Sequence, residues 1–274
     1  MKSKKLLVFL IMFIFIAVLV ILNSTLFTLQ KINLTWMTST YNLKSMTDAS
    51  ISSVIEEKGD SIFLLDKNKI KGDLEKKYPY LRVVGIETKF PNKITVYGAE
   101  REDLYAIKLA DGKYAVVDDY GKVLSKTSVL APNVSGTQLD PRPIEVLFEG
   151  IQLNDSDFLV GEQVKVGFIE NVLTKLSTTL KEANYTTLAK KGIFDTIAVR
   201  PMGNNGEVEM LLTTRNGMVI DLINAEDKMT DKFMLGLQVY NKYHQDSYSE
   251  GTIAVQYSSA QKKIIAYYND KVVE

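Results

Sequence analysis

Residues 83–97 read VVGIETKFPNKITVY, and this stretch decides the fold of the first third of the chain. Val83–Lys89 and Ile94–Tyr97 are rich in the β-branched residues that favour strands. Between them, the proline and asparagine of Phe90-Pro91-Asn92-Lys93 favour a turn. The stretch therefore predicts two strands joined by a short turn.

The residues before this pair predict a further strand and two helices. Residues 31–36 alternate polar and apolar, which is typical of a half-buried strand. Thr47 is the expected cap of a short helix ending near Gly59, and Asp66 is the cap of a second helix that Pro79 stops. The apolar positions of the helices are Ile51, Val54 and Ile55, then Ile70, Leu74 and Tyr78. The predicted order is strand, helix, helix, strand, strand, and two helices can cover one face of such a sheet.

An apolar run precedes all of these elements. Leu6–Leu22 would span roughly 26 Å as a helix, and Leu26 and Phe27 extend it to roughly 32 Å. We expect a transmembrane anchor over residues 6–27, following a cytoplasmic tail over residues 1–5. The anchor is marked by Leu6, Phe9, Ile14, Val18 and Leu22, and the topology signal by Lys2, Lys4 and Lys5.

The three lysines indicate that the N-terminus stays in the cytoplasm, so the rest of the chain is exported from a single-pass type II anchor in the cytoplasmic membrane. A cleaved signal peptide is the alternative. Its apolar core is usually about 7–15 residues long and is followed by a small-residue cleavage site. The run in this chain is longer and lacks an A-x-A-like site, so the sequence favours the anchor over the cleaved signal.

Composition excludes several function classes. Lysines plus arginines and acidic residues number 33 each, which gives no basic field for nucleic acid. The chain has no cysteine, so disulfides, thiolate metal sites and cysteine nucleophiles are excluded. An exported region of this size without disulfides fits a bacterial envelope better than a eukaryotic secretory pathway.

The second half of the chain predicts a larger, mostly antiparallel sheet domain with two long helices. Gly203–Gly206 and Asn216-Gly217 supply hairpin turns. One helix carries the apolar stripe Ile169, Val172, Leu173, Leu176 and Leu180; the other runs from about Ala225 to Tyr243, with Met229, Phe233, Leu237 and Tyr240 inward. Predicted strands include a hairpin over residues 114–124 and strands over 144–148, 194–200, 207–213, 218–222, 252–257 and 263–268.

The element order of the first region, the Asp66…Tyr78-Pro79 run and the FPNKITV turn and strand resemble a POTRA domain. POTRA domains occur in outer-membrane assembly factors and in the bitopic cell-division proteins FtsQ and DivIB. A single such domain after one anchor resembles the FtsQ/DivIB group. The hairpin Tyr114–Leu124 and the pattern Asp221…Asp231-Lys232-Phe233…Gly251–Val255 are similar to the β domain of that family. The resemblance implies an α+β chain with an N-terminal transmembrane helix, a β-α-α-β-β POTRA domain over 28–100, a β domain over 101–270 and a tail over 271–274.

The same resemblance implies a non-enzymatic divisome scaffold at the septum. Its expected partners are the lipid bilayer and bitopic division proteins resembling FtsL and FtsB or DivIC, and the assembly would lead to septal peptidoglycan synthesis. The last strands are the candidate partner-binding edge, through strand addition. Its residues are Ile253, Val255, Tyr257, Ile265, Tyr267 and Tyr268. The alternative, that the tyrosines simply pack the sheet, stays open.

Catalytic groups are not indicated. His244 is the only histidine, and a polar residue closing a helix is its expected role. Asp118-Asp119 fits a turn better than an acid pair, because adjacent side chains on a strand point apart. We therefore expect no cofactor, no metal and no small-molecule substrate. Two other functions stay open: a POTRA-type envelope assembly or export module not dedicated to division, and a membrane-anchored hydrolase.

Overall fold

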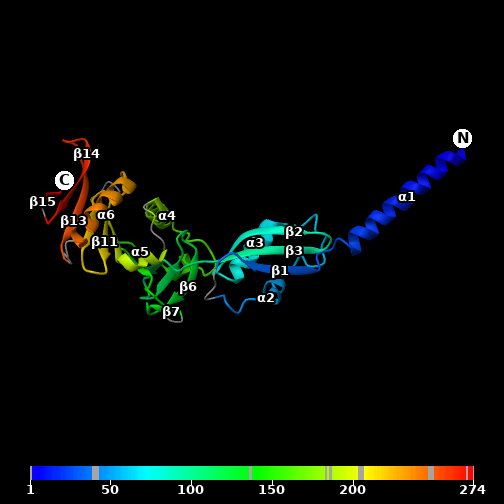
Figure 1. The fold of residues 1–274 in the computed structure, drawn as a ribbon, viewed down its shortest axis with the longest axis horizontal. Helices are drawn as coiled ribbons and strands as arrows, with labels where there is room; N and C mark the ends of the chain where they lie inside the picture. The colour runs from blue at the N-terminus through cyan, green and yellow to red at the C-terminus, as the bar shows by residue number, and fades with distance from the viewer. Residues whose placement is uncertain are drawn as a thin grey trace. The chain divides into compact units, whose positions relative to one another are not determined.

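The computed structural model describes residues 2–38, 43–135, 138–182, 184, 187–202, 207–245, 250–269 and 271–273. The chain divides into two compact units, Met1–Arg101 and Glu102–Glu274, whose helices and strands are labelled in Figure 1. Each unit has its own hydrophobic core. The predicted turn at 203–206 lies outside the described residues.

The first unit contains one long helix and a small α+β body. The elements are α1 (Lys2–Thr25), β1 (Lys31–Trp36), α2 (Asp48–Ser52), α3 (Lys67–Lys77), β2 (Leu81–Lys89) and β3 (Lys93–Glu100). The three strands form one sheet in the order β1-β3-β2, with β1 parallel and β2 antiparallel to the central β3. The predicted order of strand, helix, helix, strand, strand is confirmed.

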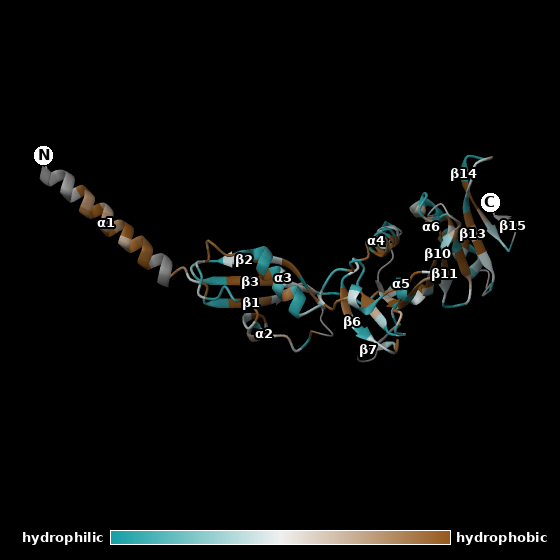
Figure 2. Ribbon diagram, turned by 180° about the vertical axis from the view of Figure 1, so that it is seen from behind, coloured by the Kyte–Doolittle hydropathy of each residue, from teal (hydrophilic) through white to brown (hydrophobic). Residues whose placement is uncertain are grey.

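Helix α1 covers most of the predicted anchor, and Figure 2 colours its described length as hydrophobic. Phe9, Ile14 and Val18 are exposed along it by 67%, 53% and 46%. The side chains of Leu6, Leu22, Lys2, Lys4 and Lys5 lie outside the described residues. Within the described part of the chain, no helix has both the length and the hydropathy that crossing a membrane requires.

Local caps explain where α2 and α3 begin. The Asp66 carboxylate accepts hydrogen bonds from the backbone amides of Asn68 and Lys69, both at 3.0 Å, as predicted. Thr47 caps α2, also as predicted, but α2 ends at Ser52 instead of near Gly59. The Ser53 hydroxyl donates to the Ser50 carbonyl at 2.7 Å, and such local serine bonds compete with helix continuation.

The second unit is built on a ten-stranded sheet with the order β15-β14-β13-β12-β11-β10-β9-β4-β5-β6. Three of its neighbouring pairs are parallel: β4 with β9, β9 with β10, and β12 with β13. The other pairs are antiparallel, in keeping with the predicted mostly antiparallel sheet. Its strands are β4 (Tyr105–Lys108), β5 (Tyr114–Val117), β6 (Val123–Thr127), β9 (Ile144–Phe148), β10 (Phe194–Met202), β11 (Glu207–Thr214), β12 (Val219–Leu222), β13 (Thr252–Ser258), β14 (Lys263–Tyr268) and β15 (Lys271–Val273).

Helices cover one face of this sheet. The remaining elements are the small hairpin β7 (Asn133–Ser135) and β8 (Gln138–Asp140), the 3₁₀ turn Asp155–Asp157, and helices α4 (Gly167–Glu182), α5 (Thr187–Ile193) and α6 (Met229–Gln245). α6 packs on β12, β13 and β14, and α4 packs against α6. All five residues of the predicted α4 stripe are at most 2% exposed, so that prediction is confirmed.

The start of α6 was predicted at Ala225 and lies at Met229. The segment before it turns twice through the left-handed region, at Asn224 (φ 49°) and Lys228 (φ 52°), which a helix cannot accommodate. Lys232 stabilises this turn, since its ammonium donates to the carbonyls of Ile223 at 3.0 Å and Asn224 at 2.6 Å.

Candidate partner-binding surfaces

The end of the large sheet carries the residues predicted as a partner-binding edge. β13 lies inside the sheet, paired with β12 on one side and β14 on the other. Ile253 and Val255 are fully buried in the core and cannot contact a partner while the unit is folded. As an edge, β13 is therefore excluded, because both of its flanks are already hydrogen-bonded.

The strand predicted to be last, β14, is not the end of the sheet either. β15 pairs with its second half, matching Ala266 with Val273, Tyr267 with Val272 and Tyr268 with Lys271. Residues 271–273 were expected to form a tail and instead add a strand. β15 does not pair with the first half of β14, Lys263–Ile265. At this end of the described sheet, the edge thus consists of β15 and the first half of β14.

Two of the three candidate tyrosines have structural roles within the unit. The Tyr268 ring stacks on Tyr243 at 4.0 Å between centroids, and its hydroxyl donates to the Glu250 carbonyl at 2.8 Å. The Tyr257 ring lies 3.8 Å beneath the ammonium of Lys228. These contacts favour sheet packing as the role of Tyr257 and Tyr268.

Tyr267 and Ile265 differ from these tyrosines in the face they occupy. Tyr267 is opposite Ala254, whereas Tyr268 is opposite the core residue Ile253. Since successive side chains of a strand point to opposite faces, Tyr267 and Ile265 lie on the face away from α6. Tyr267 is partly exposed and Ile265 is 7% exposed. Of the predicted set, Tyr267 is the side chain best placed to contact a partner at this edge.

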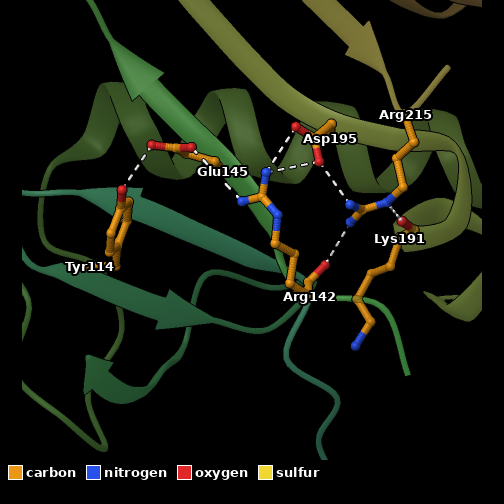
Figure 3. Close-up of polar contacts among 6 residues, drawn as sticks. All are labelled: Tyr114, Arg142, Glu145, Lys191, Asp195 and Arg215. Atoms are coloured by element: carbon orange, nitrogen blue, oxygen red, sulfur yellow. Dashed lines mark hydrogen bonds and ion pairs between the residues drawn. The ribbon is translucent and has the colours of Figure 1, made fainter. Parts of the chain in front are cut away.

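A charged network joins the starts of two neighbouring parallel strands (Figure 3). Asp195, at the start of β10, accepts hydrogen bonds from Arg142, before β9, at 2.8 Å to each carboxylate oxygen. It also accepts one from Arg215, in the turn between β11 and β12, at 2.7 Å. The guanidinium of Arg215 additionally donates to the carbonyls of Arg142 and Lys191. Charge-assisted bonds of this kind constrain geometry as well as contribute energy. The network therefore positions three segments relative to one another: the residues before β9, the junction of α5 and β10, and the turn between β11 and β12.

A buried ion pair extends the polar contacts below this network. The Lys191 ammonium lies 3.2 Å from the Asp103 carboxylate, with only 2% and 11% of the two side chains exposed. The sequence analysis identified neither residue. Lys191 belongs to α5, a short helix without the strong apolar periodicity that would have predicted it. The pair joins α5 to the segment before β4. Its geometry indicates a structural role.

A half-buried carboxylate lies on the sheet face away from α6. Asp221 on β12 is opposite Ala254 and Leu211, and its Oδ1 atom is buried without a hydrogen-bond partner among the described residues. Burial, with the nearby Glu209 carboxylate, raises the pKa of Asp221 to about 6. The position is electrostatically unfavourable for an ionised group, and no sequence pattern indicates it.

The residues considered for catalysis have structural partners. Asp118 accepts hydrogen bonds from the amides of Tyr120 at 2.9 Å and Lys122 at 2.8 Å, whereas Asp119 pairs with Lys181 at 2.6 Å. The predicted turn pair is confirmed. His244, in the last turn of α6, stacks on Tyr240 at 5.4 Å. Among the described residues, no group of three or more histidine or acidic side chains is arranged to hold a metal ion.

Residues 42–101, which contain all of the β-α-α-β-β body except its first strand, match the family described as POTRA domain, FtsQ-type. The chain is also similar to the cell division protein DivIB of Clostridium tetani, with 29% identity over 179 residues, or 63% of this chain. Both matches support a relationship to the FtsQ/DivIB family. The matched region covers 56% of that relative's length.

Proposed function

We propose that this protein is a bitopic, non-enzymatic scaffold of the bacterial divisome that links early division proteins to septal peptidoglycan synthesis. The FtsQ-type POTRA match over residues 42–101 carries the proposal. The similarity to a relative named for cell division supports the same process. As working boundaries we keep a POTRA domain over 28–100 and a β domain over 101–270.

The Leu6–Leu22 run acts as the anchor in the cytoplasmic membrane, with the two domains outside the cytoplasm. An unbroken apolar run of this length after three lysines supports that topology. Support also comes from α1, whose apolar side chains are exposed instead of packed in a core. Anchoring confines the protein and its bitopic partners to one membrane and so raises their effective concentration.

Partner binding occurs by strand addition at the end of the large sheet. The partners are bitopic division proteins resembling FtsL and FtsB or DivIC. The edge formed by β15 and the first half of β14 supplies backbone hydrogen-bonding groups, and Tyr267 supplies an aromatic contact beside it. This edge replaces the wider set of residues expected from sequence.

The test uses two edge variants of the full chain and one control. Val272→Pro removes an edge N–H, and Tyr267→Lys replaces the aromatic contact by a flexible cation. Val129→Lys is the control, because Val129 is 69% exposed in the same unit and distant in sequence from the edge. Each variant is expressed in dividing cells, followed by co-purification of the bitopic partners and by fluorescence localisation.

We expect both edge variants to lose co-purification while the control retains it and forms a mid-cell band. Thermal unfolding of each purified variant separates loss of binding from loss of fold. Unchanged co-purification of both folded edge variants would exclude the edge as the binding site. A uniform envelope signal for the unmodified protein would exclude the divisome role and favour an envelope assembly or export module.

A further inference from the structure

An exposed aromatic cluster lies where the POTRA body meets the end of α1. The Phe63 ring is 5.3 Å from that of Phe27 and 5.6 Å from that of Phe90. Phe63 and Phe90 are exposed by 60% and 66%, and Leu64 beside them by 82%. Large apolar side chains gathered on a surface mark a contact with something apolar. We call Phe27, Phe63, Leu64 and Phe90 the aromatic tip.

Backbone hydrogen bonds fix the three segments of the tip to one another. The Ile62 amide donates to the Phe27 carbonyl at 2.8 Å, and the Leu29 amide donates to the Asp60 carbonyl at 2.8 Å. The amides of Gln30 and Lys31 both donate to the Asn92 carbonyl, which belongs to the turn that carries Phe90. The tip is therefore an ordered part of the POTRA body, in which three segments are held together by backbone hydrogen bonds.

Chain connectivity places this tip next to the end of the apolar helix. α1 ends at Thr25, and Phe27 is the second residue after it. Two residues of extended chain reach at most about 7 Å. If α1 crosses the membrane, as the proposed function requires, Phe27 lies within that distance of the helix end. The tip is then at the membrane surface by covalent geometry alone.

Lysines flank the tip on the neighbouring strand ends. Lys93 on β3 is opposite Lys31 on β1 and Lys89 on β2, so the three side chains start from one face at one end of the sheet. Lys89 also pairs with Glu87 at 2.5 Å. Phenylalanine and leucine side chains combined with lysines are typical of protein segments that lie at the interface between lipid tails and headgroups.

We propose that the aromatic tip inserts into the outer surface of the lipid bilayer and holds the POTRA body against the membrane. The inference rests on the proposed anchor, because the short connection from α1 determines which surface the tip can reach. The tip contacts lipid and not a groove on another protein, since its residue Phe27 follows the apolar helix directly through Leu26, which is 43% exposed.

The test exploits the absence of cysteine, which allows single-site labelling of the full chain. Leu64→Cys and Phe90→Cys are labelled with the environment-sensitive dye NBD and reconstituted into vesicles of phosphatidylglycerol and phosphatidylethanolamine. Ile14→Cys, within α1, reports on the anchor. Val84→Cys is the matched control, because it is an exposed apolar position (56%) of the same POTRA body, on β2.

We expect a blue shift of NBD emission at positions 64 and 90, with quenching by nitroxide attached to lipid chains near the headgroup. Position 84 should give the emission of an aqueous dye, without quenching. Aqueous emission at both tip positions, with blue-shifted emission at position 14, would overturn the tip and leave the anchor intact. Aqueous emission at position 14 would refute the anchor and the tip together. Two tip positions are used so that loss of fold at one does not decide the result.

Discussion

Gly236 on α6 offers a sharp test of how closely this helix packs on the large sheet. A Cβ atom added at Gly236 would lie 2.7 Å from Cγ2 of Ile220 and 3.4 Å from Cγ2 of Val255. Both neighbours are fully buried, so neither side chain has free space into which it can move. Gly236→Ala should therefore destabilise the second unit, although alanine is the better helix former.

The magnitude follows from two opposing contributions. Alanine in place of glycine stabilises a helix by about 0.8–1 kcal/mol. Overpacking a well-packed core by a methyl group costs about 1–3 kcal/mol. Gly192→Ala, in α5 of the same unit, receives the first contribution without the second, because no atom lies within 4 Å of its added Cβ. The two variants should differ by about 1–3 kcal/mol in the free energy of unfolding, with Gly236→Ala the less stable.

Urea unfolding followed by pulse proteolysis of the full chain in detergent measures this difference. With a slope of about 2 kcal/mol per molar urea, the two midpoints should be separated by about 0.5–1.5 M. Equal stabilisation by the two substitutions would refute the close contact between α6, β12 and β13. It would mean that the helix lies farther from the sheet than the 2.7 Å distance implies.

Two other substitutions test the electrostatic features of the second unit. Burial raises the pKa of Asp221 from 3.8 to about 6, so the folded state holds this proton more tightly than the unfolded chain, and its stability falls as the pH rises through this window. Asp221→Asn should thus be more stable than the parent at about pH 7 and nearly equal to it at about pH 4; the same difference at both values in pH-resolved urea unfolding would contradict the assignment. Asp195→Ala removes the acceptor shared by Arg142 and Arg215 and should cost about 1–2 kcal/mol at low salt, less at high salt because the network is partly exposed. If urea unfolding shows a loss of stability that does not depend on salt, the contribution of Asp195 comes from packing and not from charge.

Periodic patterns in the sequence predicted those helices that bury one continuous stripe of apolar side chains. The α4 stripe and the Asp66 cap are determined within a few residues of sequence, so both were predictable. The pairing of β4 with β9 and of β9 with β10 depends on segments that lie far apart in the chain. No local pattern encodes such pairings, and the order of the strands could not be predicted.

The residues predicted as a partner-binding edge lie near one end of the large sheet, but not all of them belong to its edge strands. Ile253 and Val255 carry the alternating pattern of a strand, and that pattern is the same for an edge and for an interior strand. Only the register with β12 and β14 excludes them. β15 has three residues, which is too short for alternation to be recognised. Tyr243 on α6 stacks on Tyr268 on β14, and a contact between two separate elements cannot be predicted from a local sequence pattern.

The parallel pairing of β12 with β13 has a consequence for the order of folding. The antiparallel neighbours β13, β14 and β15 follow one another in the chain through short turns and can form early and locally. β13 pairs with β12 across a long crossover that contains α6, because that helix lies between the two parallel strands in the chain. We therefore expect β13–β15 to pack late onto the rest of the second unit. Slow amide exchange in β9 and β10 with faster exchange in β13–β15 would reveal this boundary between β12 and β13.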